Sequence, residues 1–190
     1  MKHSTKISTK QIVLVGLLAA LTCAGSALRI KVPADLVGTS AFHLGNILCA
    51  LSGILLGPWL GGLAAGLGSA IYDMFDPIYI QECWLTFLMK GAYGVVTGLV
   101  IHLGKHKWGY GKAIVATVAG ALTYAILYLA KTFFYSGMLL AGLSADAALV
   151  SVISKLPATA FNAAVAIIAA PFLAVVLRKA LAKSHLSVDR

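Results

Sequence analysis

Long apolar runs separated by short polar segments dominate this chain. The runs lie at about residues 11–28, 43–56, 60–75, 84–103, 113–140 and 147–177. A helix that crosses a bilayer needs roughly 17–25 mostly apolar residues, so the second and third runs are short for this task. The pattern predicts six transmembrane helices, of which the second and third are marginal as complete spans.

The composition places these helices in a membrane. Of the 190 residues, 60% are hydrophobic and only 11% are charged. A soluble domain has about 45–50% apolar and about 25% charged residues, and the surplus here has no water-soluble core to fill. Since no linker or separate soluble segment interrupts the pattern, we expect one all-α integral membrane domain over residues 1–190.

The basic residues indicate the orientation of the chain. Ten of them lie in the two tails and in one loop near residues 105–112, together with a single acid, Asp189. They are Lys2, Lys6, Lys10, Lys105, Lys107, Lys112, Arg178, Lys179, Lys183 and Arg190. Basic loops stay in the cytoplasm, which predicts cytoplasmic N and C termini. Because these bases flank apolar runs and form no single patch, nucleic acid is not an expected partner.

Each of the last three runs contains a lysine on a polar face. The polar positions are Thr86, Lys90, Tyr93 and Thr97 in the fourth run, Tyr124, Tyr128, Lys131 and Tyr135 in the fifth, and Lys155, Thr159 and Asn162 in the sixth. Their spacing of three or four residues places each set on one side of a helix. A lysine in hydrocarbon costs about 2.5–3.5 kcal/mol, so three matching faces predict a polar cavity between the helices.

Two other interpretations of the polar residues stay open. The lysines could instead pair with Asp73, Asp76 and Glu82, or extend to the headgroups. A small metal-dependent membrane enzyme acting on a lipid or isoprenoid would use those three acids as ligands, and a solitary facilitator would need no partner. The cysteines have no metal-ligand spacing, so neither a metal site nor a cofactor is expected.

Small residues form a stripe on the first run at Gly16, Ala20 and Ala24. Such stripes allow close approach of helix backbones in lipid. The stripe indicates a helix contact, either within this chain or with a partner.

Four motifs resemble the substrate-binding S components of energy-coupling factor (ECF) vitamin transporters, and most closely the riboflavin-transporter group. They are His43-Leu-Gly-Asn46, Gly57-Pro-Trp-Leu-Gly-Gly62, Gly66-Leu-Gly-Ser-Ala-Ile-Tyr-Asp73 and Thr86-Phe-Leu-Met-Lys-Gly91. The resemblance implies a non-enzymatic subunit of an ATP-driven importer in a bacterial plasma membrane. It also implies that the outer loops at about 29–42, 76–83 and 138–146 close over the ligand.

The resemblance further implies the partners. Ala20-Leu-Thr-Cys-Ala24 matches the AxxxA motif with which the family docks its transmembrane T component, and Gly16 extends it. Two cytoplasmic ATPase subunits would then drive a toppling of the S component that releases the ligand inside.

The predicted substrate site combines the polar faces with neighbouring residues. Its members are His43, Asn46, Asp73, Glu82, Thr86, Lys90, Tyr93, Tyr128, Lys131, Tyr135, Lys155, Thr159 and Asn162. Tyrosines and cations suit a small heteroaromatic metabolite, and pyridoxine, a pyrimidine precursor of thiamine, riboflavin and a deazapurine all fit this description.

Overall fold

The computed structural model describes residues 7–33, 39–103 and 109–183. Several residues used above to predict the orientation, Lys2, Lys6, Lys105, Lys107, Asp189 and Arg190, lie outside these ranges. The described residues form six α-helices: α1 (Thr9–Ala27), α2 (Gly45–Leu56), α3 (Pro58–Met74), α4 (Cys83–His102), α5 (Tyr110–Ala130) and α6 (Ala145–Lys183). A 3-10 turn, η2 (Ile80–Glu82), precedes α4, and a π-helix, η3 (Lys131–Leu140), continues α5.

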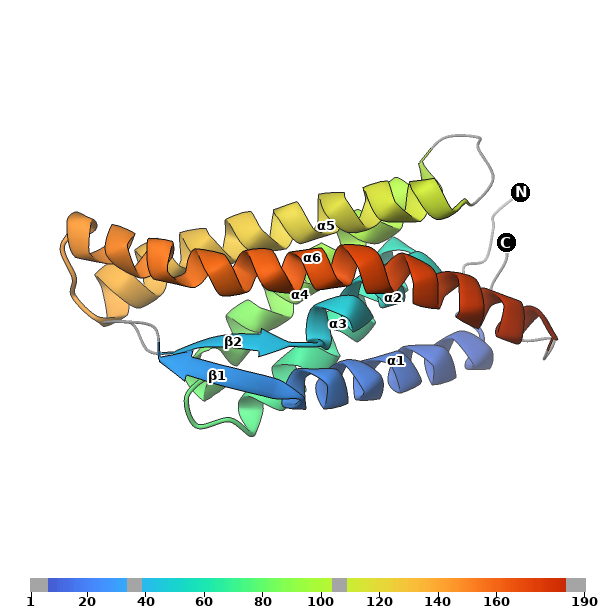
Figure 1. Cartoon of the computed structure of the whole chain (residues 1–190). Helices are drawn as coiled ribbons and strands as arrows, with labels where there is room; N and C mark the ends of the chain where they lie inside the picture. Colours follow the sequence, from blue (N-terminus) through green and yellow to red (C-terminus); the bar gives the residue numbers. More distant parts are fainter. Residues whose placement is uncertain (1–6, 34–38, 104–108, 184–190) are drawn as a thin grey trace, which may run out of the picture.

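The helices form an elongated bundle with two different ends (Figure 1). Two short strands, β1 (Arg29–Pro33) and β2 (Thr39–His43), cover one end, which we call the hairpin end. The start of α1, the start of α5 and the last turns of α6 lie at the opposite end, which we call the tail end (Figure 1). This arrangement brings together the helix ends that the charge pattern assigns to the cytoplasm.

Four helical segments are long and apolar enough to cross a membrane: Thr9–Ala27, Ile80–His102, Tyr110–Leu140 and Ala145–Leu181. By contrast, α2 has 12 residues and α3 has 17. The chain therefore has the helices of a multi-pass membrane protein, whereas six complete crossings and the orientation of the termini stay predictions.

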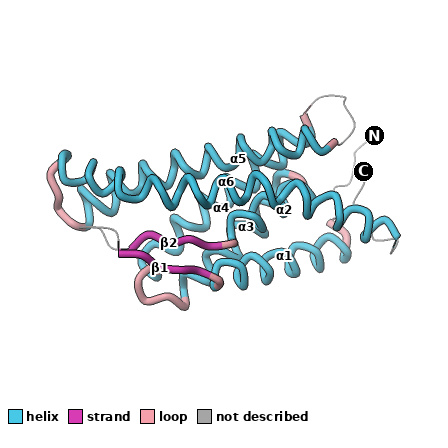
Figure 2. Tube along the Cα trace, in the orientation of Figure 1, coloured by secondary structure: helices cyan, strands magenta, loops and turns pink. Residues whose placement is uncertain are grey.

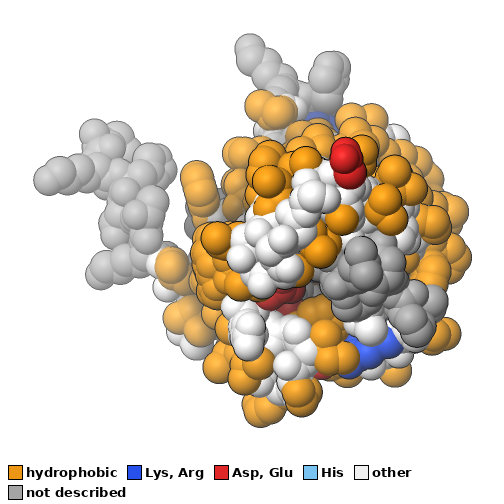
Figure 3. Space-filling view, turned by 90° about the vertical axis from the view of Figure 1, so that its left-hand side faces the viewer, with side chains coloured by type: hydrophobic (Ala, Val, Ile, Leu, Met, Phe, Trp, Pro, Cys, Tyr) orange, Lys and Arg blue, Asp and Glu red, His pale blue; other side chains and the backbone are white. Residues whose placement is uncertain are grey.

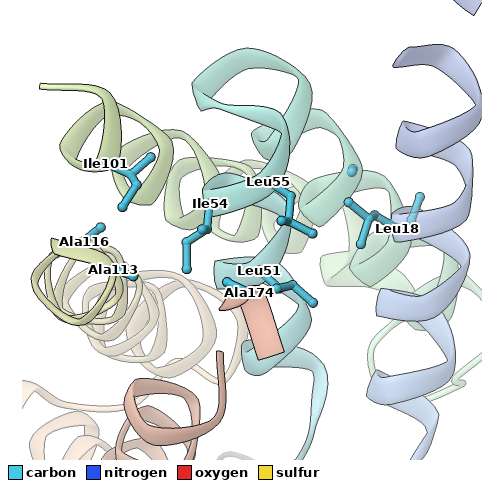
Figure 4. Close-up of a cluster of buried hydrophobic side chains, with 10 residues drawn as sticks. Leu18, Leu51, Ile54, Leu55, Ile101, Ala113, Ala116 and Ala174 are labelled. Atoms are coloured by element: carbon cyan, nitrogen blue, oxygen red, sulfur yellow. The ribbon is translucent and has the colours of Figure 1, made fainter. Parts of the chain in front are cut away.

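Glycines allow very close packing of α2, α3 and α4 in the tail-end half. A Cβ at Gly61 of α3 would lie 2.4 Å from the Ser52 carbonyl oxygen of α2, and one at Gly98 of α4 would lie 2.4 Å from the Pro58 nitrogen. Gly57 joins α2 to α3 with a φ of 78°, a conformation that L side chains rarely adopt. Leu18, Leu51, Ile54 and other buried apolar side chains fill this half (Figure 4).

The structure differs from the all-α prediction at one place, the segment 29–42 that was expected to be a loop. Here β1 and β2 pair antiparallel, with Arg29 opposite His43 and Lys31 opposite Ala41 (Figure 2). The alternation Arg29-Ile30-Lys31-Val32 contains two β-branched residues and is typical of a strand. The usual arrangement of a strand, with apolar side chains inward and polar ones outward, is reversed here. Ile30 is 72% exposed, while the Arg29 side chain is buried.

Candidate functional site

A polar cavity lies beneath the hairpin, among α3, α4, α5 and α6. The empty space there, including the part that is open to solvent, amounts to about 660 Å³. Seen from the hairpin end, one acidic patch lies in a recess between hydrophobic and other atoms, and a second acidic group stands out at the surface (Figure 3). The lining residues are Ser26, Arg29, Ser40, Ala41, His43, Ser69, Asp73, Tyr79, Glu82, Thr86, Met89, Lys90, Tyr124, Tyr128, Lys131, Thr159 and Asn162.

Arg29 holds the first strand against the bundle. Its guanidinium carbon lies 3.9 Å from the centroid of the Tyr72 ring and 5.2 Å from that of Tyr79. One of its terminal nitrogens lies 3.6 Å from Asp73 Oδ1, and its Nε donates a hydrogen bond to the Ser26 carbonyl. Arginine suits this position because its planar group can stack on rings and pair with a carboxylate at once.

A second cation of the hairpin is anchored further out. Lys31 Nζ lies 2.7 Å from Asp76 Oδ2, and Asp76 Oδ1 accepts a hydrogen bond from the Ile78 N–H at 3.1 Å. Burial by itself would raise the pKa of Asp76, but the Lys31 ammonium and the Ile78 N–H outweigh it and lower this pKa below its usual value. Asp76 is therefore ionised at neutral pH and ties β1 to the segment after α3.

The polar side chain of Asn162 fastens the second strand to α6. Its Nδ2 donates to the Ala41 carbonyl at 2.7 Å, and its Oδ1 accepts the His43 N–H at 3.0 Å. The imidazole of His43 turns back to its own chain, where Nδ1 accepts the Gly45 N–H at 3.2 Å. Burial, with the nearby charges of Lys90 and Arg29, holds the pKa of His43 well below its usual value, so this imidazole is neutral.

On the α5 side of the cavity, Lys131 and Glu82 form an ion pair. The Ser136 hydroxyl donates a hydrogen bond to the other carboxylate oxygen of Glu82 at 2.7 Å. Lys131 and Ser136 both belong to the π-helix η3, a form that is rare and often occurs at functional sites. The wider π turn also rotates Tyr135 away from the face that α-helical spacing predicted, and its ring packs on Trp84 at 6.0 Å.

Lys90 has a different environment. It is buried, donates to the Asn46 Oδ1 oxygen and places its ammonium 3.8 Å from the centroid of the Tyr124 ring. The rings of Tyr93, Tyr124 and Tyr128 are stacked, with centroids 5.9 and 5.7 Å apart. This stack presents flat aromatic surface and positive charge to the same space.

The structure brings most of the predicted site residues to one cavity. His43, Asp73, Glu82, Thr86, Lys90, Tyr128, Lys131, Thr159 and Asn162 line it. Four others do not: Asn46 lies behind Lys90, Tyr93 is buried below Tyr124, Tyr135 packs on Trp84, and Lys155 is buried with its ammonium 5.9 Å from the Tyr128 ring centroid.

Sequence reasoning omitted three notable lining residues. Tyr124 was assigned to the correct helix face but not to the site, although it lies one turn before Tyr128. Arg29 and Tyr79 belong to segments that were expected to be loops. The strand pattern around Arg29 was the signal available for placing its side chain inward.

The pairing of the acids bears on both alternatives left open by the sequence. Asp73 pairs with Arg29, Asp76 with Lys31 and Glu82 with Lys131. Of the three lysines within helical runs, Lys131 therefore forms an ion pair with one of these acids. Each acid that a metal-dependent enzyme would need as a ligand already has a cationic partner.

The small residues of α1 occupy two faces with different surroundings. Ala19, Thr22 and Gly25 are buried against α2 and α3. Gly16, Ala20 and Ala24 are exposed on the outside of the bundle, and a Cβ added at Gly16 would meet no atom within 4 Å. In the described structure, the stripe is therefore not used for packing within the chain.

Comparison with known proteins adds two findings. Residues 6–180 match the family described as "ECF-type riboflavin transporter, S component". An "Uncharacterized protein in gap 3'region" of Pyrococcus woesei is 30% identical over 118 residues, which are 62% of this chain and 74% of that protein.

Proposed function

Because this chain belongs to the family of ECF-type riboflavin transporter S components, we propose that it captures a small heteroaromatic vitamin or related metabolite in the cavity beneath its hairpin. Membership makes it a vitamin-transporter subunit and a multi-pass membrane protein, not an enzyme. The observation that supports capture is the cavity itself, which combines stacked tyrosines with buried cations and opens under a hairpin held by polar contacts. Pyridoxine, a thiamine pyrimidine precursor, riboflavin and a deazapurine are its candidate ligands.

We further propose that the chain works with a T component and two cytoplasmic ATPases in a bacterial plasma membrane. In this proposal, Gly16, Ala20 and Ala24 dock the T component, and toppling of the subunit releases the ligand inside. The exposure of the stripe supports docking, since in lipid a face of small residues gains contact area mainly from a second helix.

Replacing a stripe residue by a large one tests the docking proposal. We expect Ala24→Trp to abolish co-purification with the T component and ATPases and to reduce ATP-dependent uptake at least tenfold, because the indole prevents close backbone approach. Thermal stability of the isolated subunit should stay unchanged, since Ala24 is exposed.

The matched control is Ala164→Trp, which places the same side chain at an exposed alanine of α6. It should leave assembly and uptake intact. Normal assembly of the Ala24→Trp variant, or uptake that persists after ATP depletion, would contradict the proposal.

A further inference from the structure

The charges that line the cavity do not balance. Its lining contains three bases, Arg29, Lys90 and Lys131, but only two acids, Asp73 and Glu82. A sixth group that could alter this count, His43, is neutral because its Nδ1 accepts a hydrogen bond from the Gly45 N–H. One positive charge is therefore in excess, within a site surrounded by apolar helices.

The excess charge can be assigned to Lys90. The Asp73 carboxylate pairs with Arg29, and Glu82 pairs with Lys131 and accepts a bond from Ser136. Among the residues that the structure describes, no ion pair involves Lys90, whose ammonium contacts the Asn46 oxygen and the Tyr124 ring. These partners are neutral, and an ammonium has three donors.

A buried charge is costly unless it meets an opposite charge or enough hydrogen bonds. Lys90 is only 4% exposed, yet it belongs to the cavity wall. Beside it the Tyr124 and Tyr128 rings form a stacked flat surface, with centroids 5.7 Å apart. A ligand that lies on these rings would bring its substituents within reach of this ammonium.

We propose that the natural ligand is a planar ring compound with one anionic oxygen group, a carboxylate or a phosphate, that binds to Lys90. This inference rests on the proposed function and narrows it. The family's description names riboflavin, which has no ionised group at neutral pH, so this chain would differ in the class of its ligand.

A small-molecule extract of the source cells, divided on an anion exchanger at pH 7, tests the charge of the ligand. The full-length protein in lipid nanodiscs is heated with the retained or the unretained fraction. The retained fraction should raise the unfolding temperature, and mass spectrometry of molecules then released by heat should find a ring compound with an acidic group.

Substitutions test the role of Lys90. The Lys90→Met variant should need about tenfold or more of the retained fraction to reach the same rise in unfolding temperature, because it loses a hydrogen bond between charged groups. Lys112→Met removes an equal charge in the first turn of α5, away from the cavity lining, and should respond like the wild type. If Lys90→Met fails to fold, Lys90→Gln replaces it, and the fractionation of the wild type still decides the ligand's charge.

Three outcomes are distinguishable. Stabilisation by the unretained fraction alone would overturn the anionic ligand while leaving capture intact. An unchanged response of the Lys90 variant would overturn the role of Lys90. If neither fraction stabilises the wild type, the proposed capture function fails, and this inference fails with it.

Discussion

The two halves of this bundle are packed in opposite ways. In the tail-end half, glycines bring α2, α3 and α4 so close that a single added methyl group would overlap backbone atoms. In the hairpin-end half, α3, α4, α5 and α6 surround a polar cavity that is covered by two strands. In lipid, burial alone does not drive helices together, so close contact must supply the stability. The contrast indicates that the tail-end half is a rigid support for the hairpin-end half, which can accept a ligand.

The strongest test of the rigid half is Gly61→Ala. Its Cβ would lie 2.4 Å from the Ser52 carbonyl oxygen and 2.7 Å from the Gly53 Cα, and backbone atoms cannot move aside as a flexible side chain can. We expect a loss of about 3 kcal/mol in the free energy of unfolding, measured by denaturation in mixed micelles. Gly111→Ala is the control, since a Cβ there meets nothing within 4 Å. Equal stability of the two variants would remove the basis of the comparison.

An effect of similar size, but confined to the hairpin end, is expected from Arg29→Met. The change leaves the buried Asp73 without its arginine, at a cost of about 3 kcal/mol that falls on the docking of the hairpin. Amide hydrogen exchange should become faster in residues 39–43 but not in α2. Lys31→Met should have a weaker effect, about 1 kcal/mol or less, because the Lys31 side chain is 35% exposed. Faster exchange throughout the bundle would contradict two separable halves.

The smallest expected effect is that of pH on the ion pair between Lys31 and Asp76. The folded-state pKa of Asp76 is lowered, so its pair with Lys31 stabilises the hairpin above the unfolded-state pKa of about 4 and is lost as the pH falls through the folded value. Hydrogen exchange of the hairpin, corrected for intrinsic rates, should be constant from about pH 7 to 5 and rise below about pH 4. The Lys31→Met variant should show a smaller rise, and an equal one would exclude this pair as the cause.

Much of this architecture could be read from local patterns. Run length and apolar content predicted six helices, and i, i+4 spacing placed Thr86 with Lys90 and Thr159 near Asn162 on the cavity side of their helices. These predictions succeeded because α-helical periodicity is a local property of the backbone. They failed at Tyr135, where the chain changes from α to π geometry after Ala130 and the spacing no longer holds.

The partners of the charged groups were beyond sequence reasoning. Lysines and acids were known to lie near one end, but Arg29 and Lys31 take Asp73 and Asp76 only because β1 folds back over α3. With Asp73 and Asp76 paired in this way, Glu82 pairs with Lys131, and Lys90 contacts neutral groups. Pairings between residues about 45 positions apart depend on how the elements dock, which no local pattern encodes.

By itself, the sequence determined that this protein is helical, apolar and embedded in a membrane, because hydrophobic run length and helical periodicity act within single segments. It also determined which side chains could face a common interior. Only the tertiary structure decided that a β-hairpin covers that interior, that Asp73, Asp76 and Glu82 each have their own base, and that one buried lysine faces the cavity with neutral partners. The charge balance of a low-dielectric site depends on which charged residues lie next to one another. The fold determines this when it packs the helices and strands together.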